Sequence, residues 1–149
     1  MKYLFTLVLC FSFVAGFSQI EDPVKWNYAA VKKGDNAYEL VITAVVPKPW
    51  HIYSQATAKG GPVPTSFVFK KNPLITADGK LKENGKMETI HDKNFGVDVK
   101  YYSDRVEFVQ TVKLKGKVKT NIAGTVEYMV CNDEKCLPPT KKSFDVKLQ

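Results

Sequence analysis

Apolar and polar residues alternate with a period of two along several stretches of this sequence. The alternation runs through residues 38–46, 63–69, 106–114 and 118–130, and it returns near the end at Phe144, Val146 and Leu148. Such a pattern is typical of strands that bury one face, because successive side chains of a strand point to opposite sides. After the N-terminal segment, no stretch keeps the 3.6-residue period of an amphipathic helix. The sequence therefore predicts an all-β domain.

Turn-forming residues separate the predicted strands. Residues 33–36 (Lys-Gly-Asp-Asn) join a first strand at 24–31 to the strand at 38–46. Asp78-Gly79 and Asn84-Gly85 predict tight turns around residues 80–83. Many short strands with turn signals every 8–12 residues are typical of an immunoglobulin-like β-sandwich, which is the fold that we expect.

A pair of cysteines flanks a short polar loop after the strand at 118–130. Cys131 and Cys136 enclose Asn-Asp-Glu-Lys, and two prolines end the segment. A four-residue hairpin loop would place the cysteines opposite each other, with Cα atoms about 4.5–5.5 Å apart. Continuing the alternation of the strand puts Cys131 on the exposed face, together with Glu127. We expect two sulfurs within bonding distance on an outer face, which is typical of a redox-active pair.

The short distance between the cysteines also bears on what their bond does. A ring of this size restricts the unfolded chain by only about 2 kcal/mol, the low end for a disulfide. Antibody domains instead join their two sheets through cysteines that are far apart in sequence. A small, reducible bridge is therefore the favoured interpretation, and a local staple on a hairpin is the alternative.

The N-terminus has the pattern of a secretory signal peptide. Lys2 precedes an apolar run, and Gly16-Phe17-Ser18 fits the small-x-small rule for cleavage. We expect residues 1–18 to be removed and residues 19–149 to form one exported domain. The apolar run is shorter than the roughly 20 residues of a spanning helix. A retained anchor is therefore the weaker interpretation, and no stable membrane insertion is expected after cleavage.

The charge distribution and the predicted export argue against a nucleic-acid partner and for a disulfide. The net charge is +7 at pH 7, but the lysines are scattered in a way that is typical of a solvated surface. An exported protein rarely meets nucleic acid, so we expect no nucleic-acid partner. Cys10 lies in the predicted signal peptide, which leaves Cys131 and Cys136 to form a disulfide in an oxidising compartment.

The cysteine segment, Tyr128-x-x-Cys131-x4-Cys136-x-Pro138-Pro139, resembles the N-terminal periplasmic domain of the thiol:disulfide interchange protein DsbD. Residues 50–53 (Trp-His-Ile-Tyr) are similar to the aromatic strand of that domain. Residues 91–96 (His-Asp-Lys-Asn-Phe-Gly) are similar to its cap loop, and residues 101–106 to the strand that follows. The resemblance covers about residues 26–148 and implies an immunoglobulin-like periplasmic domain that shuttles reducing equivalents.

The resemblance also implies the partners. It is to one domain of a longer protein, so the donor and acceptor of electrons are expected to be other chains. These would be thioredoxin-like oxidoreductases, with a separate membrane electron-transfer protein as a further candidate. The expected activity is that of a protein-disulfide reductase component that needs no cofactor.

Three residues carry the exchange chemistry that the resemblance implies. Cys136 would bond the partner, and Cys131 would resolve the mixed disulfide. Asp92 could take or give the thiol proton, because a carboxylate in an apolar pocket can have its pKa raised towards neutrality. The alternative for Asp92 is a turn residue that caps its own loop.

Four aromatic or imidazole side chains are the predicted supporting residues. Phe95 could shield the sulfurs as a movable lid, or it could be an ordinary core aromatic. Tyr53 could hydrogen-bond a sulfur or Asp92, or it could be a buried strand tyrosine with a satisfied hydroxyl. His91 belongs to the cap loop, and Tyr128 opens the cysteine motif.

Metal binding is the remaining chemistry that the composition allows. His51 and His91 with the two cysteines could form a zinc site, but their spacing is not that of a finger or ribbon. Met129 with the cysteines offers soft ligands for Cu(I), although Met129 is more simply an outer-face strand residue. We expect no metal. A copper or zinc carrier, and an immunoglobulin-like envelope binding module with a structural disulfide, remain alternatives.

Overall fold

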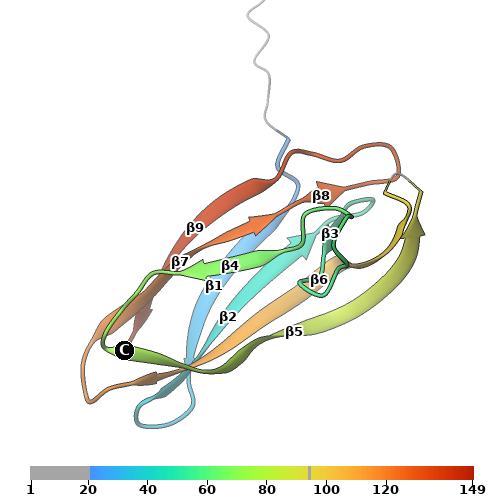
Figure 1. The fold of residues 1–149 in the computed structure, drawn as a ribbon. Coiled ribbons are helices and arrows are strands. Elements are labelled where there is room, and N and C mark those ends of the chain that lie inside the picture. Colours follow the sequence, from blue (N-terminus) through green and yellow to red (C-terminus); the bar gives the residue numbers. More distant parts are fainter. Residues whose placement is uncertain (1–20, 94) are drawn as a thin grey trace, which may run out of the picture.

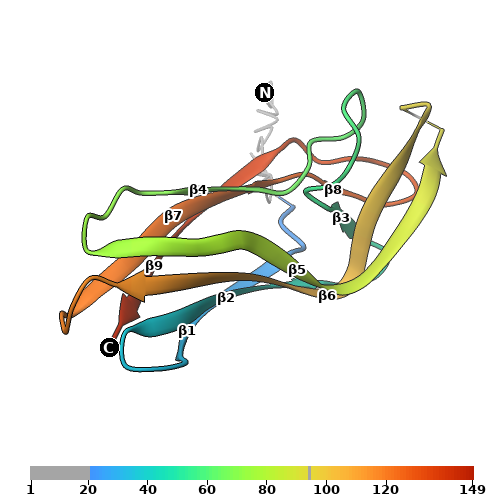
Figure 2. The ribbon, with the colours of Figure 1, turned by 60° about the horizontal axis from the view of Figure 1, so that its bottom comes forward.

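The computed structural model describes residues 21–93 and 95–149 (Figure 1). The predicted signal peptide, residues 1–18, lies outside the described residues. The described part of the chain forms strands, turns and irregular segments. It contains no helix that is long and apolar enough to span a bilayer. Two antiparallel β-sheets face each other (Figure 2), which confirms the predicted all-β sandwich.

The larger sheet carries the segments that resemble the cap loop and the aromatic strand. Its strands are β1 (Lys25–Lys32), β2 (Ala37–Val46), β3 (His51–Tyr53), β5 (Ile75–Asp92), β6 (Val97–Leu114) and β8 (Val130–Cys131). Their order is β1-β2-β6-β3-β8, and β5 pairs with the other edge of β6. The long strand β6 pairs with β2 through its C-terminal half and with β3 through Tyr101 and Tyr102.

The smaller sheet is the other half of the sandwich. It contains β4 (Ser66–Phe69), β7 (Thr120–Tyr128) and β9 (Thr140–Leu148) in the order β4-β7-β9. The chain leaves this sheet at Tyr128 and enters the larger sheet at Val130. Only Met129 separates the two strands, and this change of sheet decides where the first cysteine lies.

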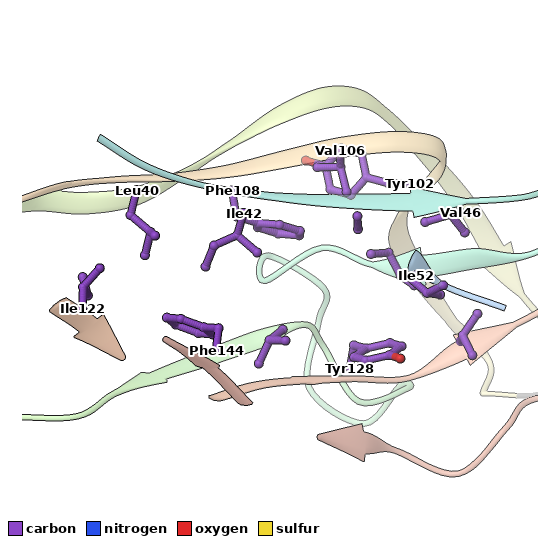
Figure 3. Packing of buried hydrophobic residues seen from close by; sticks show 14 of the residues in the cluster. Leu40, Ile42, Val46, Ile52, Tyr102, Val106, Phe108, Ile122, Tyr128 and Phe144 are labelled. Atoms are coloured by element: carbon purple, nitrogen blue, oxygen red, sulfur yellow. The ribbon is translucent and has the colours of Figure 1, made fainter. Parts of the chain in front are cut away.

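The main core fills the space between the sheets (Figure 3). The larger sheet contributes the inward residues of β2 and β6, which include Leu40, Ile42, Ala44, Val46, Val106, Phe108 and Val112. The smaller sheet contributes Ile122, Val126, Tyr128, Phe144 and Leu148. Burial of each large side chain stabilises the fold by about 1.5–3 kcal/mol. These faces are the ones that the alternation predicted.

The predicted tight turns at residues 78–79 and 84–85 are wrong. Both dipeptides lie inside β5, which continues to Asp92 without reversing direction. At both places the pairing between β5 and β6 shifts register. Dipeptides that suit tight turns also suit β-bulges, because glycine accepts a positive φ or a close backbone contact. The strand that alternation predicted at 106–114 is also longer than expected, because β6 already begins at Val97.

The second bulge bends the β5–β6 hairpin. At Gly85 a side chain would meet the Arg105 carbonyl oxygen at 3.1 Å, and Asp104 has a positive φ of 64°. Asp104 lies where β6 changes its partner from β3 to β2. Beyond the bend, the distal end of the hairpin turns towards the side of the smaller sheet and rises beside β8 (Figure 2). The bend therefore brings the cap loop to the cysteines.

Candidate redox site

The two cysteines close a short hairpin that begins at β8. Cys131 and Cys136 form an antiparallel bridge and are joined by a disulfide, with Cα atoms 4.0 Å apart. Leu137 N–H donates to the Val130 carbonyl at 2.9 Å. Asn132 Oδ1 accepts hydrogen bonds from two backbone N–H groups within the loop. The predicted four-residue hairpin is confirmed, although its cysteine Cα atoms are closer than the expected 4.5–5.5 Å.

The predicted exposure of Cys131 is wrong. Cys131 is 2% exposed and packs with Tyr53 and Val99 in a small cluster separate from the main core. The alternation of β7 does not continue through Met129, because Val130 and Cys131 belong to β8 and pair with β3 in the other sheet. Both are buried there. Cys136 is half-buried, so the two sulfurs differ in access.

A pocket of about 240 Å³ lies between the cysteine hairpin and the distal end of the β5–β6 hairpin. Its lining comes from four places in the fold: strand β3, the cap region, strand β6 and the cysteine hairpin. The residues are His51, Tyr53, Ile90, His91, Asp92, Lys93, Tyr101, Cys131, Asn132, Asp133 and Cys136. Both cysteines, Asp92, His91 and Tyr53 of the predicted site are therefore brought together around one cavity.

Asp92 lies at the end of β5, where it both accepts hydrogen bonds within its own turn and lines the cysteine pocket. Its carboxylate accepts a hydrogen bond from the Phe95 N–H at 3.4 Å, and its carbonyl accepts one from Gly96 N–H at 2.7 Å. Asp92 therefore helps to hold its own turn, as the simpler interpretation predicted. It also lines the cysteine pocket, so the catalytic interpretation stays a prediction.

Two predicted supporting residues are not among the described residues that line the pocket. Phe95 is half-buried in the turn after β5, and its role as a lid stays a prediction. Tyr128 lies in the main core, where its hydroxyl donates to Asp22 Oδ1 at 3.0 Å and its ring packs 5.0 Å from Trp26. The tyrosine of the motif therefore stabilises the sandwich and does not face the disulfide pocket.

His51, which the sequence suggested only as a possible zinc ligand, is one of the pocket residues that were not predicted for an exchange site. It is the Cα partner of Cys131 across β3 and β8. Its Nε2 lies 3.2 Å from the Tyr53 hydroxyl, and its ring centroid lies 4.8 Å from that of Tyr101. The period of two places His51 and Tyr53 on one face of their strand. No local pattern, however, tells which strand will pair with the cysteines.

Burial and nearby carboxylates set the electrostatics of the pocket. Burial lowers the pKa of the His51 imidazole below its usual 6.5, while the charges of Asp133 and Asp92 act in the opposite direction. Burial raises the pKa of the Tyr53 hydroxyl, and the charge of Asp92 raises it further. His91 lies at the rim, where its Nδ1 is 2.8 Å from Asp98 Oδ1. Near neutral pH, His51 is therefore a neutral imidazole and Tyr53 a neutral phenol.

The zinc donors that the composition suggested, His51, His91 and the two cysteines, all line the pocket, but the cysteines are bonded to each other. Within residues 21–93 and 95–149, no three His, Cys, Asp or Glu side chains form a group that could hold a metal ion. Met129 is partly buried and packs against the cluster around Cys131. Its predicted position on an outer strand face is wrong, because it lies between β7 and β8.

Comparisons with known proteins show the family to which the chain belongs. The family model for the N-terminal domain of the thiol:disulfide interchange protein DsbD matches residues 20–148. No curated protein matches the sequence significantly. The N-terminal periplasmic domain of ScsB from Proteus mirabilis superimposes with a TM-score of 0.62 at 15% identity. That match covers 84% of this chain but only 46% of the ScsB chain.

Two structures from Neisseria meningitidis share the fold at a TM-score of 0.52. The DsbD N-terminal domain in its reduced form is 16% identical, over 79% of this chain and 82% of that chain. The same domain in complex with the PilB N-terminal domain is 14% identical, over 82% of this chain and 80% of that chain. These likenesses confirm the predicted immunoglobulin-like fold. With the family match over nearly all described residues, this chain belongs to the DsbD N-terminal domain family.

Proposed function

We propose that this chain is a periplasmic thiol:disulfide exchange domain that passes reducing equivalents between thioredoxin-like partners through Cys131 and Cys136. The observation that carries the proposal is the disulfide itself, because its two sulfurs differ in access beside one pocket. Cys131 is 2% exposed and Cys136 is half-buried. Membership of the DsbD N-terminal family supports the reaction class.

The unequal exposure supports a separate role for each cysteine. In the reduced form, the Cys136 thiolate attacks a partner disulfide, forms a mixed disulfide and releases one partner sulfur as a thiolate. The Cys131 thiolate then attacks Cys136 Sγ, re-forms the internal bond and releases the second partner sulfur. Two electrons pass from this domain to the partner. The reverse sequence reloads the domain from a reduced donor.

The surroundings of the disulfide suit this exchange. Asp92 brings a carboxylate to the pocket and is the cap residue that we assign to proton handling. Ile90 is 52% exposed at the pocket rim, and it offers an apolar contact to a partner protein. A related domain forms a complex with the PilB N-terminal domain, and the ScsB relative is periplasmic. Both facts support a protein partner and an exported location.

The test is to replace each of the two cysteines by serine in turn. Cys131→Ser leaves Cys136 as the attacking thiol, and the variant should accumulate a mixed disulfide with a thioredoxin-like protein from an extract of the native compartment. The matched control Cys136→Ser should trap roughly tenfold less adduct, because access and thiolate fraction govern the exchange rate. Non-reducing gels and mass spectrometry measure the adducts.

The same experiment also tests the alternative that the disulfide is only a structural staple. If the hairpin disulfide only stiffens a binding module, neither variant should trap a thioredoxin-like protein, and the wild-type bond should resist reduction by a thioredoxin system. Equal trapping by both variants would contradict the assigned roles of the two cysteines.

A further inference from the structure

We propose that His51 is the proton acceptor for the Cys131 thiol during resolution of the mixed disulfide. This inference rests on the proposed function and deepens it. It names the group that makes a buried thiol reactive, a role that the cap carboxylate alone does not explain.

The buried position of Cys131 creates the need for an internal base. Only a thiolate attacks a disulfide, and burial in apolar surroundings disfavours the charged sulfur. Cys136 is half-buried and within reach of solvent or a partner, but Cys131 is 2% exposed and packs against Tyr53 and Val99. A neighbouring side chain that accepts the proton of Cys131 as the sulfur attacks would therefore make this thiol reactive.

The strand register places His51 beside Cys131. His51 on β3 and Cys131 on β8 are direct antiparallel partners. Partners of this kind point to the same face, with Cβ atoms about 4.5–5.5 Å apart. Both side chains line the same pocket, together with Cys136. Because β3 also pairs with β6 through Tyr101 and Tyr102, the imidazole is carried by a strand held on both edges.

The ring of His51 is held in place by two tyrosines. Its Nε2 is 3.2 Å from the Tyr53 hydroxyl, and its ring packs at 5.3 Å from Tyr53 and 4.8 Å from Tyr101. A neutral imidazole has one donor nitrogen and one acceptor nitrogen. If Nε2–H donates to Tyr53, Nδ1 keeps the lone pair that receives the thiol proton.

The charges around His51 favour this role. The groups that face it across the pocket are Asp92, Lys93 and His91 of the cap, Asp133 of the cysteine hairpin, and Tyr53 and Tyr101 of the sheet. Burial keeps the imidazole neutral near pH 7, so it is able to accept a proton, and the carboxylates of Asp133 and Asp92 stabilise the imidazolium. Asp92 thus acts through His51.

The step balances in atoms and electrons. The S–H bond of Cys131 breaks, its proton goes to His51, and the sulfur electron pair forms the bond to Cys136 Sγ. The bond between Cys136 and the partner sulfur breaks, and its electron pair leaves with the partner as a thiolate. The imidazolium then returns the proton to that thiolate or to solvent. The oxidant is the partner disulfide of the proposed function.

A two-phase colour assay isolates this step. The reduced protein is mixed with an aromatic disulfide that releases one coloured thiolate when Cys136 attacks and a second when Cys131 resolves the adduct. In the wild type, the rate of the second phase should rise through an inflection below pH 6.5, the usual histidine pKa. His51→Gln should slow that phase by about 10²-fold, the low end for general base catalysis, and should abolish the inflection.

Two control variants separate proton transfer from structural damage. Tyr53→Phe removes the hydroxyl that contacts His51 but keeps the imidazole, so its second phase should keep the inflection. Cys131→Ser should show the first phase alone. The first phase should keep its wild-type rate in His51→Gln, because Cys136 attacks before His51 acts.

The outcomes distinguish the two proposals. Wild-type resolution that matches His51→Gln in rate and pH profile would overturn the role of His51 while leaving the exchange function intact. Loss of the inflection in Tyr53→Phe to the same degree as in His51→Gln would also overturn it. Failure of the wild-type protein to exchange with any thioredoxin-like disulfide would instead remove the proposed function.

Discussion

Gly124 lies in the middle strand of the smaller sheet. It is buried in β7 and pairs with Phe69 of β4 on one side and Phe144 of β9 on the other. A methyl group at Gly124 would lie 2.6 Å from the Val68 carbonyl oxygen and 2.7 Å from Phe144 Cζ. The first of these contacts is with backbone, which cannot turn away as a side chain can. The position therefore requires glycine for space.

Gly124→Ala should lower the free energy of unfolding by about 1–3 kcal/mol, the usual cost of overpacking a close-packed interior. The matched control is Gly34→Ala, where the nearest atom to a new methyl group would be 3.9 Å away. That exposed change should be neutral or slightly stabilising, because alanine restricts the unfolded chain. Urea unfolding curves of both variants measure the difference, and equal stability would contradict the packing argument.

At the scale of single residues, the sequence predicted which side chains lie together better than how buried they are. Cys131, Cys136, Asp92 and Tyr53 were predicted as site residues, and all four line one pocket. The sequence misplaced Cys131 on an exposed face, because alternation holds only within one strand and β7 ends at Tyr128. A place for His51 in the exchange site was not predicted, for a related reason. The importance of His51 follows from pairing with a strand that lies far along the chain.

The β5–β6 hairpin is the element that shapes the candidate site, and Glu83 fastens it to the rest of the fold. The carboxylate accepts hydrogen bonds from Ser54 Oγ at 2.6 Å, Gln55 N–H at 2.8 Å and the Tyr102 hydroxyl at 2.9 Å. Ser54 is fully buried. Glu83 thus ties β5 to the segment after β3 and to β6, close to the bend at Gly85.

Glu83→Ala should lower the free energy of unfolding by about 1–3 kcal/mol, because the buried Ser54 and Tyr102 hydroxyls lose their acceptor. It should also speed hydrogen exchange in the distal half of the hairpin, where the tie is lost. Glu107→Ala is the control: it removes an exposed ion pair with Arg105, which is worth about 0–1 kcal/mol. Similar losses of unfolding free energy in both variants would show that the hydrogen bonds of Glu83 stabilise the fold no more than an exposed ion pair does.

The hairpin also shows why two local signals for tight turns gave wrong predictions. Residues 78–79 and 84–85 carry dipeptides that favour reversal of the chain, but each lies in a bulge of a continuous strand. Turn and bulge place similar demands on glycine. The choice between them depends on the partner strand β6, whose pairing continues past both points.

The whole molecule buries many tyrosine hydroxyls, and this gives its stability a pH dependence. Burial raises the pKa of several tyrosines above the usual 10.0, and these are Tyr28, Tyr53, Tyr101, Tyr102 and Tyr128. For Tyr102, burial together with the hydrogen bond to Glu83 and the Glu83 charge raises the pKa to about 12. The folded state therefore keeps protons that the unfolded chain gives up.

Stability should fall as the pH rises above 10.0. In the window from 10.0 to about 12 the unfolded state loses tyrosine protons that the folded state holds, so deprotonation favours unfolding. The contribution is fully present below pH 10.0 and is lost as the pH passes the folded-state value. Urea midpoints across this window measure the loss. Tyr102→Phe should lose less than the wild type, and equal pH dependence of the two proteins would contradict the assignment.

The sequence by itself determined the features that are local. Alternation with a period of two determined the inward faces of β2, β6, β7 and β9, because successive side chains of a strand point to opposite faces and the apolar ones are buried. The spacing of Cys131 and Cys136 determined the hairpin and its small disulfide ring, because a four-residue loop joins them directly.

Only the tertiary structure decided the features that depend on contacts between distant segments. The change of sheet at Met129 buries Cys131, the register of β3 against β8 brings His51 to it, and a bent hairpin supplies the cap. Each depends on pairing between residues tens of positions apart, and no local pattern specifies such pairing. The surroundings of the two sulfurs are therefore set by the sandwich as a whole, although the cysteines themselves lie close together in the chain.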